Sequence, residues 1–372
     1  MKRKFMVTLL IIAAVLMQAV VFAHAAEVET LAGVGSHGAE DGESAQFNLP
    51  FGVARKPSGE ILVADTFNSL IRAIDENGYV TSLTSHGPRP VAGGFPTGGY
   101  ADGAIGEALF NRPSDLAVGL HGWIFVADTF NHAIRVIVGG YVYTMAGGLE
   151  EGFANGNRQE AKFRYPSAIA VCPLGFIYVS DTGNHAIRRI DLSGNVTTVA
   201  GVQGIYGYNN GVANAALFDS PMGLVFCESG WLYIADTGNH VIRVLHDGEV
   251  GTFAGSRLVP HDADFGEWRD APVGGFADGQ LNEARFNRPM GLTIFGEVLF
   301  VADSGNHSIR VVFGGEVLTI AGSGYPGLVD GSLAEAMFYL PSGLYVFGNT
   351  LLVADTGNNM VRRVDLMAID VN

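Results

Sequence analysis

The sequence predicts an all-β protein, a six-bladed β-propeller made of four-stranded antiparallel blades. Three observations lead to this prediction. One ten-residue phrase occurs six times, from VADTFNSLIR to VADTGNNMVR, and each copy has an aspartate, an asparagine three residues later and an arginine seven residues later. Successive copies lie 52 to 67 residues apart, a spacing typical of repeat architectures. Between them, short apolar runs alternate with Gly, Asn and Asp, as in strands joined by turns.

Each repeat unit reads in the same order. A DG or NG pair comes first, then Ala-x-Phe, then a proline that precedes the aspartate by 14 or 15 residues. The first strand follows the proline, the second ends at the aspartate, the third carries the arginine, and the fourth reads Gly-x-Val-x-Thr-x-Ala-Gly. Runs of β-branched and aromatic residues suit sheets that are packed on both faces. The unit is one blade, and its prolines are Pro50, Pro113, Pro166, Pro221, Pro289 and Pro341.

The two ends of the repeat array predict how the ring closes. The sixth unit stops after Asp365 without its fourth strand, and the segment EVETLAG before the first unit matches that strand. We therefore expect residues 28–32 to supply the outermost strand of blade 6. Closure of this kind removes an open sheet edge and ties the ends of the ring together.

The VADTGNHxIR phrase, followed by a Gly-x-Val-x-Thr-x-Ala-Gly strand, resembles the NHL repeat, and the resemblance covers roughly residues 28 to 366 in six copies. It implies a propeller that serves as a protein-binding or RNA-binding module, as an extracellular sensor or adhesion domain, or as a metal-dependent enzyme similar to the peptide-amidating lyases. This chain departs from the pattern at Ser69 and Asn359, which replace the histidine, and in blade 1, where the strand after Gly78 ends TSLTS.

The first 25 residues have the pattern of a secretory signal peptide, which leaves residues 26–372 as a single propeller domain. Lys2, Arg3 and Lys4 precede an apolar run over residues 5–22, and Ala-His-Ala at 23–25 supplies a cleavage pattern. The run is long enough that an uncleaved membrane anchor is the alternative. We expect export to the cell surface, the envelope or the outside of the cell, and no membrane span once the leader is removed.

Charge excludes one of the functions that the resemblance implies. The chain carries a formal net charge of -15, and removing the leader takes away three cations. Nucleic-acid binding needs a basic surface that releases counterions, so we reject RNA binding. The two cysteines, Cys172 and Cys227, occupy equivalent places on the first strands of neighbouring blades. An exported protein can form a disulfide there, and two buried free thiols are the alternative.

The repeated polar residues fit a structural role better than a site, because function is seldom spread over six identical positions. Each arginine would lie between blades, where a buried guanidinium needs a partner such as the repeat aspartate. The pairs are Asp65 with Arg72, Asp128 with Arg135, Asp181 with Arg188, Asp236 with Arg243, Asp303 with Arg310 and Asp355 with Arg362. We expect the glycine of the phrase to supply a positive φ, so that the turns of blades 1 and 2, with Phe67 and Phe130 there, must differ.

The other repeated positions receive similar interpretations. Histidines recur at one position in four blades, at His132, His185, His240 and His307, which suits hydrogen bonding in a turn better than a metal cluster. The DG and NG pairs resemble turn formers more than calcium loops. Four aromatic residues, Tyr100, Phe153, Tyr208 and Phe276, precede these pairs by two positions. They could form a partial ring that stacks sugars or peptide side chains, or they could pack beneath the loop.

Deviations from the repeat are better candidates for a binding site. Two long links, 85–101 after blade 1 and 256–277 after blade 4, should face each other across one mouth of the channel, on the face that carries the Asp-Thr-Gly-Asn turns. Loops on a rigid scaffold are where binding usually resides. The first link offers His86 and Arg89; the second offers His261, Asp264, Trp268 and Arg269, with Trp268 as the expected contact anchor.

We therefore expect a monomeric binding module, without a cofactor or a metal, whose partner is a protein, peptide or glycan. The alternative is a metal-dependent lyase or hydrolase at the channel mouth. Such an enzyme would draw its ligands singly from separate blades and leave no local motif. Its non-repeated candidates are His37, His86, His121 and His261, with Glu228 and Glu297 on the opposite face.

Overall fold

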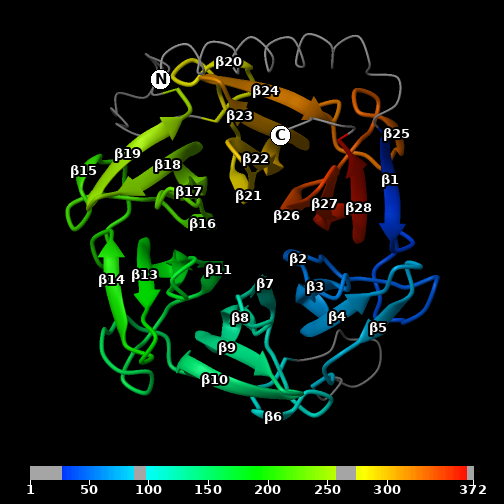
Figure 1. Cartoon of the computed structure of the whole chain (residues 1–372). Coiled ribbons are helices and arrows are strands. Elements are labelled where there is room, and N and C mark those ends of the chain that lie inside the picture. Colours follow the sequence, from blue (N-terminus) through cyan, green and yellow to red (C-terminus); the bar gives the residue numbers. More distant parts are fainter. Residues whose placement is uncertain (1–26, 88–97, 257–273, 367–372) are drawn as a thin grey trace, which may run out of the picture.

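The computed structural model describes residues 27–87, 98–256 and 274–366, which form six blades around a central axis (Figure 1). Each blade is an antiparallel sheet whose first strand lies innermost. Within these residues the only helical elements are six single 3-10 turns, at 66–68, 129–131, 182–184, 237–239, 304–306 and 356–358. The described part of the chain contains no helix that is long and apolar enough to cross a membrane.

The strands follow the predicted order in every blade. Blade 1 is β2 (Val53–Arg55), β3 (Ile61–Asp65), β4 (Leu70–Ile74) and β5 (Val80–Ser82). Blade 2 is β7 (Pro113–Val118), β8 (Ile124–Asp128), β9 (Ala133–Val138) and β10 (Tyr141–Gly147). Blade 3 is β11 (Pro166–Val171), β12 (Ile177–Asp181), β13 (Ala186–Ile190) and β14 (Val196–Ala200).

The second half of the ring repeats this plan. Blade 4 is β16 (Pro221–Phe226), β17 (Leu232–Asp236), β18 (Val241–His246) and β19 (Glu249–Ala254). Blade 5 is β21 (Pro289–Phe295), β22 (Val298–Asp303), β23 (Ser308–Phe313) and β24 (Glu316–Ala321). Blade 6 is β26 (Pro341–Phe347), β27 (Thr350–Asp355), β28 (Met360–Asp365) and β1 (Glu27–Ala32).

Strand β1 closes the ring as expected. It pairs antiparallel with β28, with Val28 opposite Val364 and Thr30 opposite Arg362. It is not the outermost strand, however, because β25 (Gly331–Ser332) pairs with its outer edge. Equivalent two-residue strands, β6 (Gly103–Ala104), β15 (Gly211–Val212) and β20 (Gly279–Gln280), cover blades 2, 4 and 5. The four-stranded blade of the prediction therefore gains a fifth strand in four places, where the link between blades runs along the outer edge.

The core lies between neighbouring blades. The repeat phenylalanines are among the largest fully buried side chains: Phe47, Phe110, Phe163, Phe218, Phe286 and Phe338. Around them, apolar residues from adjacent sheets form shared clusters, such as the one that joins Leu62 of blade 1 to Val126 of blade 2. A blade is thus stabilised by its neighbours as well as by its own strands. Cys172 and Cys227 are buried free thiols at the ends of β11 and β16, and they form no disulfide.

The 3-10 turns lie on one face of the ring, and the loops between the first and second strands lie on the other. Pro113, which begins β7, pairs with Asp128, which ends β8, and the same register recurs in blades 3 to 6. The links therefore enter the innermost strands on the face that carries the six 3-10 turns, which we call the turn face. The loops between the first and second strands, such as residues 119–123 of blade 2, lie on the opposite face.

The turns of blades 1 and 2 do not differ from the others, contrary to expectation. The positive φ belongs to the residue after the asparagine, with values of 58° at Ser69, 53° at His132 and 54° at His185. At Gly183 a Cβ would lie 2.7 Å from the Arg164 side chain, whereas Phe67 and Phe130 occupy the equivalent position of the same turn in blades 1 and 2. The backbone angle of the turn therefore does not require glycine at this position, and the contact at Gly183 depends on its neighbour Arg164.

Candidate functional site

The repeated aspartates and arginines form the buried framework of the blades. In blade 3, the fully buried Arg188 donates to the Asp181 carboxylate at 2.7 Å, to the Asn155 side chain at 2.8 Å and to two backbone carbonyls. All six blades contain the aspartate to arginine pair, at 2.6 to 2.9 Å. Burial raises the pKa of Asp181 to about 6, and the Arg188 charge opposes this shift. These inaccessible pairs offer no surface to a ligand.

The first residue of each DG or NG pair is a second partner of the arginine, and the turn-former interpretation missed this role. Asp102 accepts from Arg135 Nη2 at 2.6 Å and from the backbone nitrogen of Thr144 at 2.9 Å. Asn155 and Asn210 make the same contact through their amide oxygens. The link along the outer edge of the blade places these side chains beside a guanidinium more than 30 residues away in sequence. Local sequence gives no sign of such a distant partner.

The four aromatic residues proposed as a ring around a ligand lie in separate blades. Each stacks over the arginine of its own blade, with 4.4 to 5.1 Å between the guanidinium carbon and the ring centroid. Tyr100 lies over Arg135, Phe153 over Arg188, Tyr208 over Arg243 and Phe276 over Arg310. They contact the framework near the outer edges of the blades, as the packing alternative describes, and do not surround a common ligand position.

The recurring histidines connect neighbouring blades. Nδ1 of His185 accepts a hydrogen bond from the backbone nitrogen of Ser220, in the next blade, at 3.0 Å. Ser69 and Asn359, which replace the histidine, make the equivalent bond through side-chain oxygens. The other members are His132, His240 and His307. Burial lowers the pKa of His185, which favours the neutral form that can accept at Nδ1. The histidines do hydrogen-bond, but their partners belong to the next blade rather than to the turn.

Most of the long-link candidates cannot be placed. Arg89, His261, Asp264, Trp268 and Arg269 lie outside the described residues. His86, half-buried in the link after β5, is described. The prediction that the two long links recognise the ligand therefore stays a prediction.

An aromatic and arginine cluster, which we call the mouth cluster, lies on the turn face of blades 1 to 3. It consists of Phe67, Arg112, Phe130 and Tyr165. The guanidinium of Arg112 lies 4.6 Å from the ring centroids of both Phe67 and Phe130, and Phe130 packs edge-on against Tyr165 at 5.2 Å. Arg112 forms no ion pair with another described residue. The cluster thus presents an arginine that is oriented by stacking and available to an anionic group.

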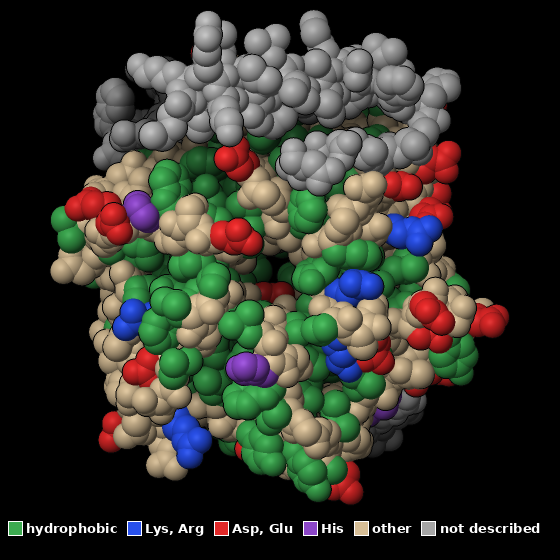
Figure 2. All heavy atoms as spheres, in the orientation of Figure 1, with side chains coloured by type: hydrophobic (Ala, Val, Ile, Leu, Met, Phe, Trp, Pro, Cys, Tyr) green, Lys and Arg blue, Asp and Glu red, His purple; other side chains and the backbone are tan. Residues whose placement is uncertain are grey.

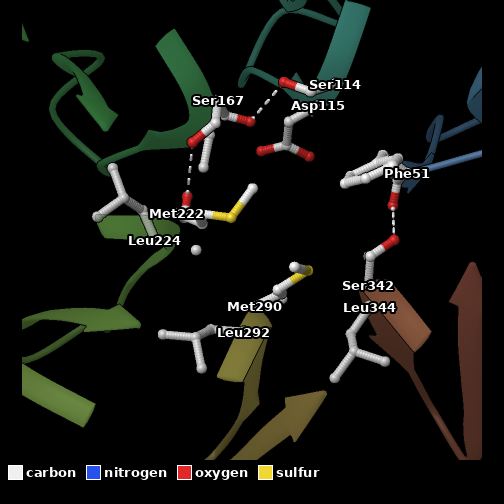
Figure 3. A pocket seen from close by; sticks show the side chains of 14 residues that line it. Phe51, Ser114, Asp115, Ser167, Met222, Leu224, Met290, Leu292, Ser342 and Leu344 are labelled. Carbon is white, nitrogen blue, oxygen red and sulfur yellow. Dashed lines mark hydrogen bonds between the residues drawn. The ribbon is translucent and has the colours of Figure 1, made fainter. Parts of the chain in front are cut away.

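The first residues of the innermost strands line an open cavity of about 60 Å³ at the centre of the ring (Figure 3), and Asp115 in this lining follows Arg112 by three residues in the chain. Every blade contributes to its lining, including Phe51 from blade 1, Ser167 from blade 3, Met222 from blade 4 and Met290 from blade 5. Figure 2 shows that the ring is hollowed at its centre and that acidic side-chain atoms lie inside the hollow. The volume is enough for several water molecules or a small chemical group.

Asp115 is the one ionisable residue in the lining of this cavity. Its carboxylate points into the cavity (Figure 3) and accepts a hydrogen bond from the backbone nitrogen of Ile169, in the next blade, at 2.9 Å. Burial raises the pKa of Asp115 to about 7, and backbone hydrogen bonds from Ile169 and Leu116 oppose the shift. No described cation pairs with it. The lining of the cavity therefore contains a carboxyl group without a counterion among the described residues.

Sequence reasoning missed Asp115, although a signal was present. The residue two positions after the repeat proline is Gly52, Ala168, Gly223, Gly291 or Gly343 in the other five blades. A Cβ at Gly223 would lie 1.8 Å from the backbone oxygen of Met290, because the innermost strands approach each other closely there. Asp115 is the one residue larger than alanine at this position. A Cβ at the neighbouring Gly52 would lie 3.0 Å from Asp115 Oδ1, so the glycine leaves room for the carboxyl group. Comparing the repeats at this column would have identified it.

Comparisons with known proteins agree with this architecture. A family model described as the NHL repeat matches residues 163–190. The chain is 30% identical over 346 residues to NHL repeat-containing protein 2 of Bos taurus, covering 83% of this chain and 45% of the relative. It is 33% identical over 282 residues to Protein SUPPRESSOR OF QUENCHING 1, chloroplastic, of Arabidopsis thaliana, covering 72% of this chain and 26% of the relative. The chain thus spans less than half the length of these relatives.

Solved structures share the fold at lower identity. An auxiliary nutrient binding protein from Bacteroides ovatus superposes with a TM-score of 0.65 at 18% identity, over 92% of this chain and 76% of that one. This likeness concerns the fold alone. Together with six copies of the repeat phrase and six blades, the sequence matches show that the chain belongs to the NHL-repeat β-propellers.

Proposed function

We propose that this protein is an exported ligand-binding module whose site is the turn-face mouth of the channel. The observation that carries the proposal is the arrangement of Arg112. Its guanidinium is held between two aromatic rings without an acidic partner among the described residues, next to a cavity lined by all six blades. A structural arginine in this protein is instead fully buried and paired, as Arg188 is.

The chemistry of the mouth cluster indicates the class of ligand. Phe130 is 42% exposed, so its ring is available for stacking on a sugar or a peptide side chain. Arg112 can bind a carboxylate through two parallel hydrogen bonds. A peptide or a glycan with an acidic group provides both features. The similarity in fold to a protein described as nutrient binding supports a binding role, and the N-terminal leader supports export.

Paired variants on the two faces test this proposal. Arg112→Ala and Phe130→Ala alter the turn face. Arg55→Ala and Trp123→Ala are their controls on the opposite face, because Arg55 also stacks on a ring, that of Phe347 at 4.3 Å, and Trp123 is 45% exposed. Each purified variant is screened against peptide and glycan arrays, and each hit is measured by calorimetry.

We expect the turn-face variants to lose at least tenfold in affinity for hits that the opposite-face variants bind normally. This corresponds to the loss of about 1.4 kcal/mol, the scale of one charge-assisted contact. Affinity that depends on Arg55 and Trp123 instead would place the site on the opposite face. Equal affinity in all four variants would show that the ligand contacts neither surface.

A further inference from the structure

The cavity at the centre of the ring has a lining that is acidic in one place and otherwise neutral. It contains one carboxylate, that of Asp115, and no cationic side chain. The three serines in its wall donate their hydroxyl hydrogens to backbone carbonyls: Ser114 to Ser167, Ser167 to Met222, and Ser342 to Phe51. These hydroxyls therefore add acceptor oxygens rather than free donors. The polar part of the lining is electronegative, and it suits a group that donates hydrogen bonds and carries positive charge.

The apolar side chains of the lining favour an organic cation over a metal ion. Phe51, Met222 and Met290 provide an aromatic ring and two thioethers (Figure 3). Polarisable groups of this kind suit an alkylammonium, whose charge is attracted by a ring face and whose methylenes pack on sulfur. Magnesium and calcium require six or more oxygen ligands. No group of three or more His, Cys, Asp or Glu side chains is placed to hold a metal ion within residues 27–87, 98–256 and 274–366.

We propose that the channel mouth binds the primary ammonium group of its ligand, with the Asp115 carboxylate as its counterion. The ligand class is an amine such as a lysine side chain, a peptide N-terminus or an amino sugar. This inference rests on the proposed function, because it assumes that the ligand enters from the turn face. It goes further by naming the group that fills the cavity and the residue that recognises it.

The position of Asp115 explains why such a group would be bound there and not elsewhere on this acidic protein. Surface carboxylates are screened by water and salt. Asp115 is instead partly buried where it lies against the innermost strands β7 and β11 and the chain around Gly52, facing the cavity. None of these elements places a second ionisable side chain in the cavity lining; Arg112, the nearest charged residue before it in sequence, is held by Phe67 and Phe130. An ammonium group would therefore neutralise a partly buried carboxylate that has no cation among the described residues.

The probe is n-butylammonium chloride, with n-butanol as its neutral counterpart, and binding is measured by calorimetry and by NMR of the Asp115 carboxyl carbon. The test variant is Asp115→Asn, which keeps an oxygen for the Ile169 nitrogen. The matched control is Asp247→Asn, at an exposed turn on the opposite face where the φ of 48° suits asparagine. We expect saturable binding of n-butylammonium, at least tenfold weaker binding of n-butanol, and at least a tenfold loss in Asp115→Asn alone.

The affinity of the wild type for n-butylammonium should also rise between pH 6 and pH 8, because the carboxylate loses its proton over this interval. Asp115→Asn should lack this dependence. Equal binding of n-butylammonium to the wild type and Asp115→Asn would overturn the inference, as would no binding at pH 8. If Arg112→Ala still abolishes capture of array ligands in that event, the turn-face site stands and only the ammonium assignment fails.

Discussion

Replacing Arg188 with alanine tests the structural interpretation of the repeat. The side chain is fully buried, and its two terminal nitrogens contact Asp181, Asn155 and the backbone oxygens of Lys162 and Ala154 at 2.6 to 3.1 Å. The variant leaves the Asp181 carboxylate buried without a counterion. Breaking a buried pair in this way destabilises a protein by roughly 3 to 5 kcal/mol. The free energy of unfolding should fall by that amount at neutral pH.

The assay is equilibrium unfolding in guanidinium chloride, together with thermal melting. The entropy of unfolding scales with chain length, so each kcal/mol shifts the melting temperature of a chain this long by about 1.4 °C, and the expected shift is about 4 to 7 °C. Arg189→Ala is the control, because Arg189 is the next residue of β13, is only partly buried and stacks on Phe176 at 5.2 Å. It should cost no more than about 1 kcal/mol.

The pH dependence identifies the cause. Arg188 lowers the pKa of Asp181, so its removal raises that pKa further and favours the protonated acid. The deficit of Arg188→Ala relative to the wild type should therefore shrink as the pH falls from 8 to 5, because a neutral Asp181 needs no counterion. The reasoning would be refuted if Arg188→Ala and Arg189→Ala unfolded at the same denaturant concentration. If the stability lost in Arg188→Ala did not change with pH, the loss would come from packing alone.

Three further predictions concern other parts of the ring. Deleting residues 27–32 should lower stability by several kcal/mol, since β28 loses its outer partner strand and the apolar contacts of the buried Val28 are removed; melting of the shortened chain within a degree or two of the intact one would contradict this. His185→Asn should leave the melting temperature nearly unchanged, as Asn359 makes the equivalent bond, whereas His185→Ala should cost about 1 to 3 kcal/mol; equal melting of the two variants would remove the inter-blade role. Burial raises the pKa of Asp115 to about 7 in the folded state, so its contribution to stability is fully present below the unfolded-state pKa and is lost as the pH rises through about 7. Denaturation at pH 5 and pH 8 should thus show Asp115→Asn gaining stability relative to the wild type at the higher pH, and a difference that does not change with pH would argue against the buried charge.

Much of the fold could be predicted because each blade is encoded locally. Six copies of one phrase give six sheets, and the register of the second and third strands follows from the aspartate and the arginine seven residues later. Closure by β1 was also readable, since a lone segment matched the strand that blade 6 lacks. The fifth strands were not predicted, because two residues of an inter-blade link carry no strand pattern; in blades 1 and 3 the equivalent contact is a single bridge, Gly42 to Val80 and Gly156 to Val196.

Comparison of the six repeats also distinguished the structural residues from candidate binding residues. It drew attention to the two long links, however, and not to Asp115. The long links stood out by length, and their key residues lie outside the described parts of the chain. Asp115 is a single substitution in a column of small residues, and its importance depends on what surrounds it. Neither its raised pKa nor the absence of a cationic side chain from the described cavity lining can be seen without the neighbouring blades.

The sequence by itself determined the number of blades, the order of strands and the pairing of each repeat aspartate with its arginine, because these depend on spacings within one repeat. It also determined the closure of the ring, because a segment at one end of the array matches the strand that is missing at the other end. Only the tertiary structure decided what meets at the channel mouth. Ser342 donates to the backbone oxygen of Phe51 from 291 residues away, and both residues line a cavity to which all six blades contribute. The charge, burial and shape of that cavity arise when the ring closes, and no local pattern of residues contains them.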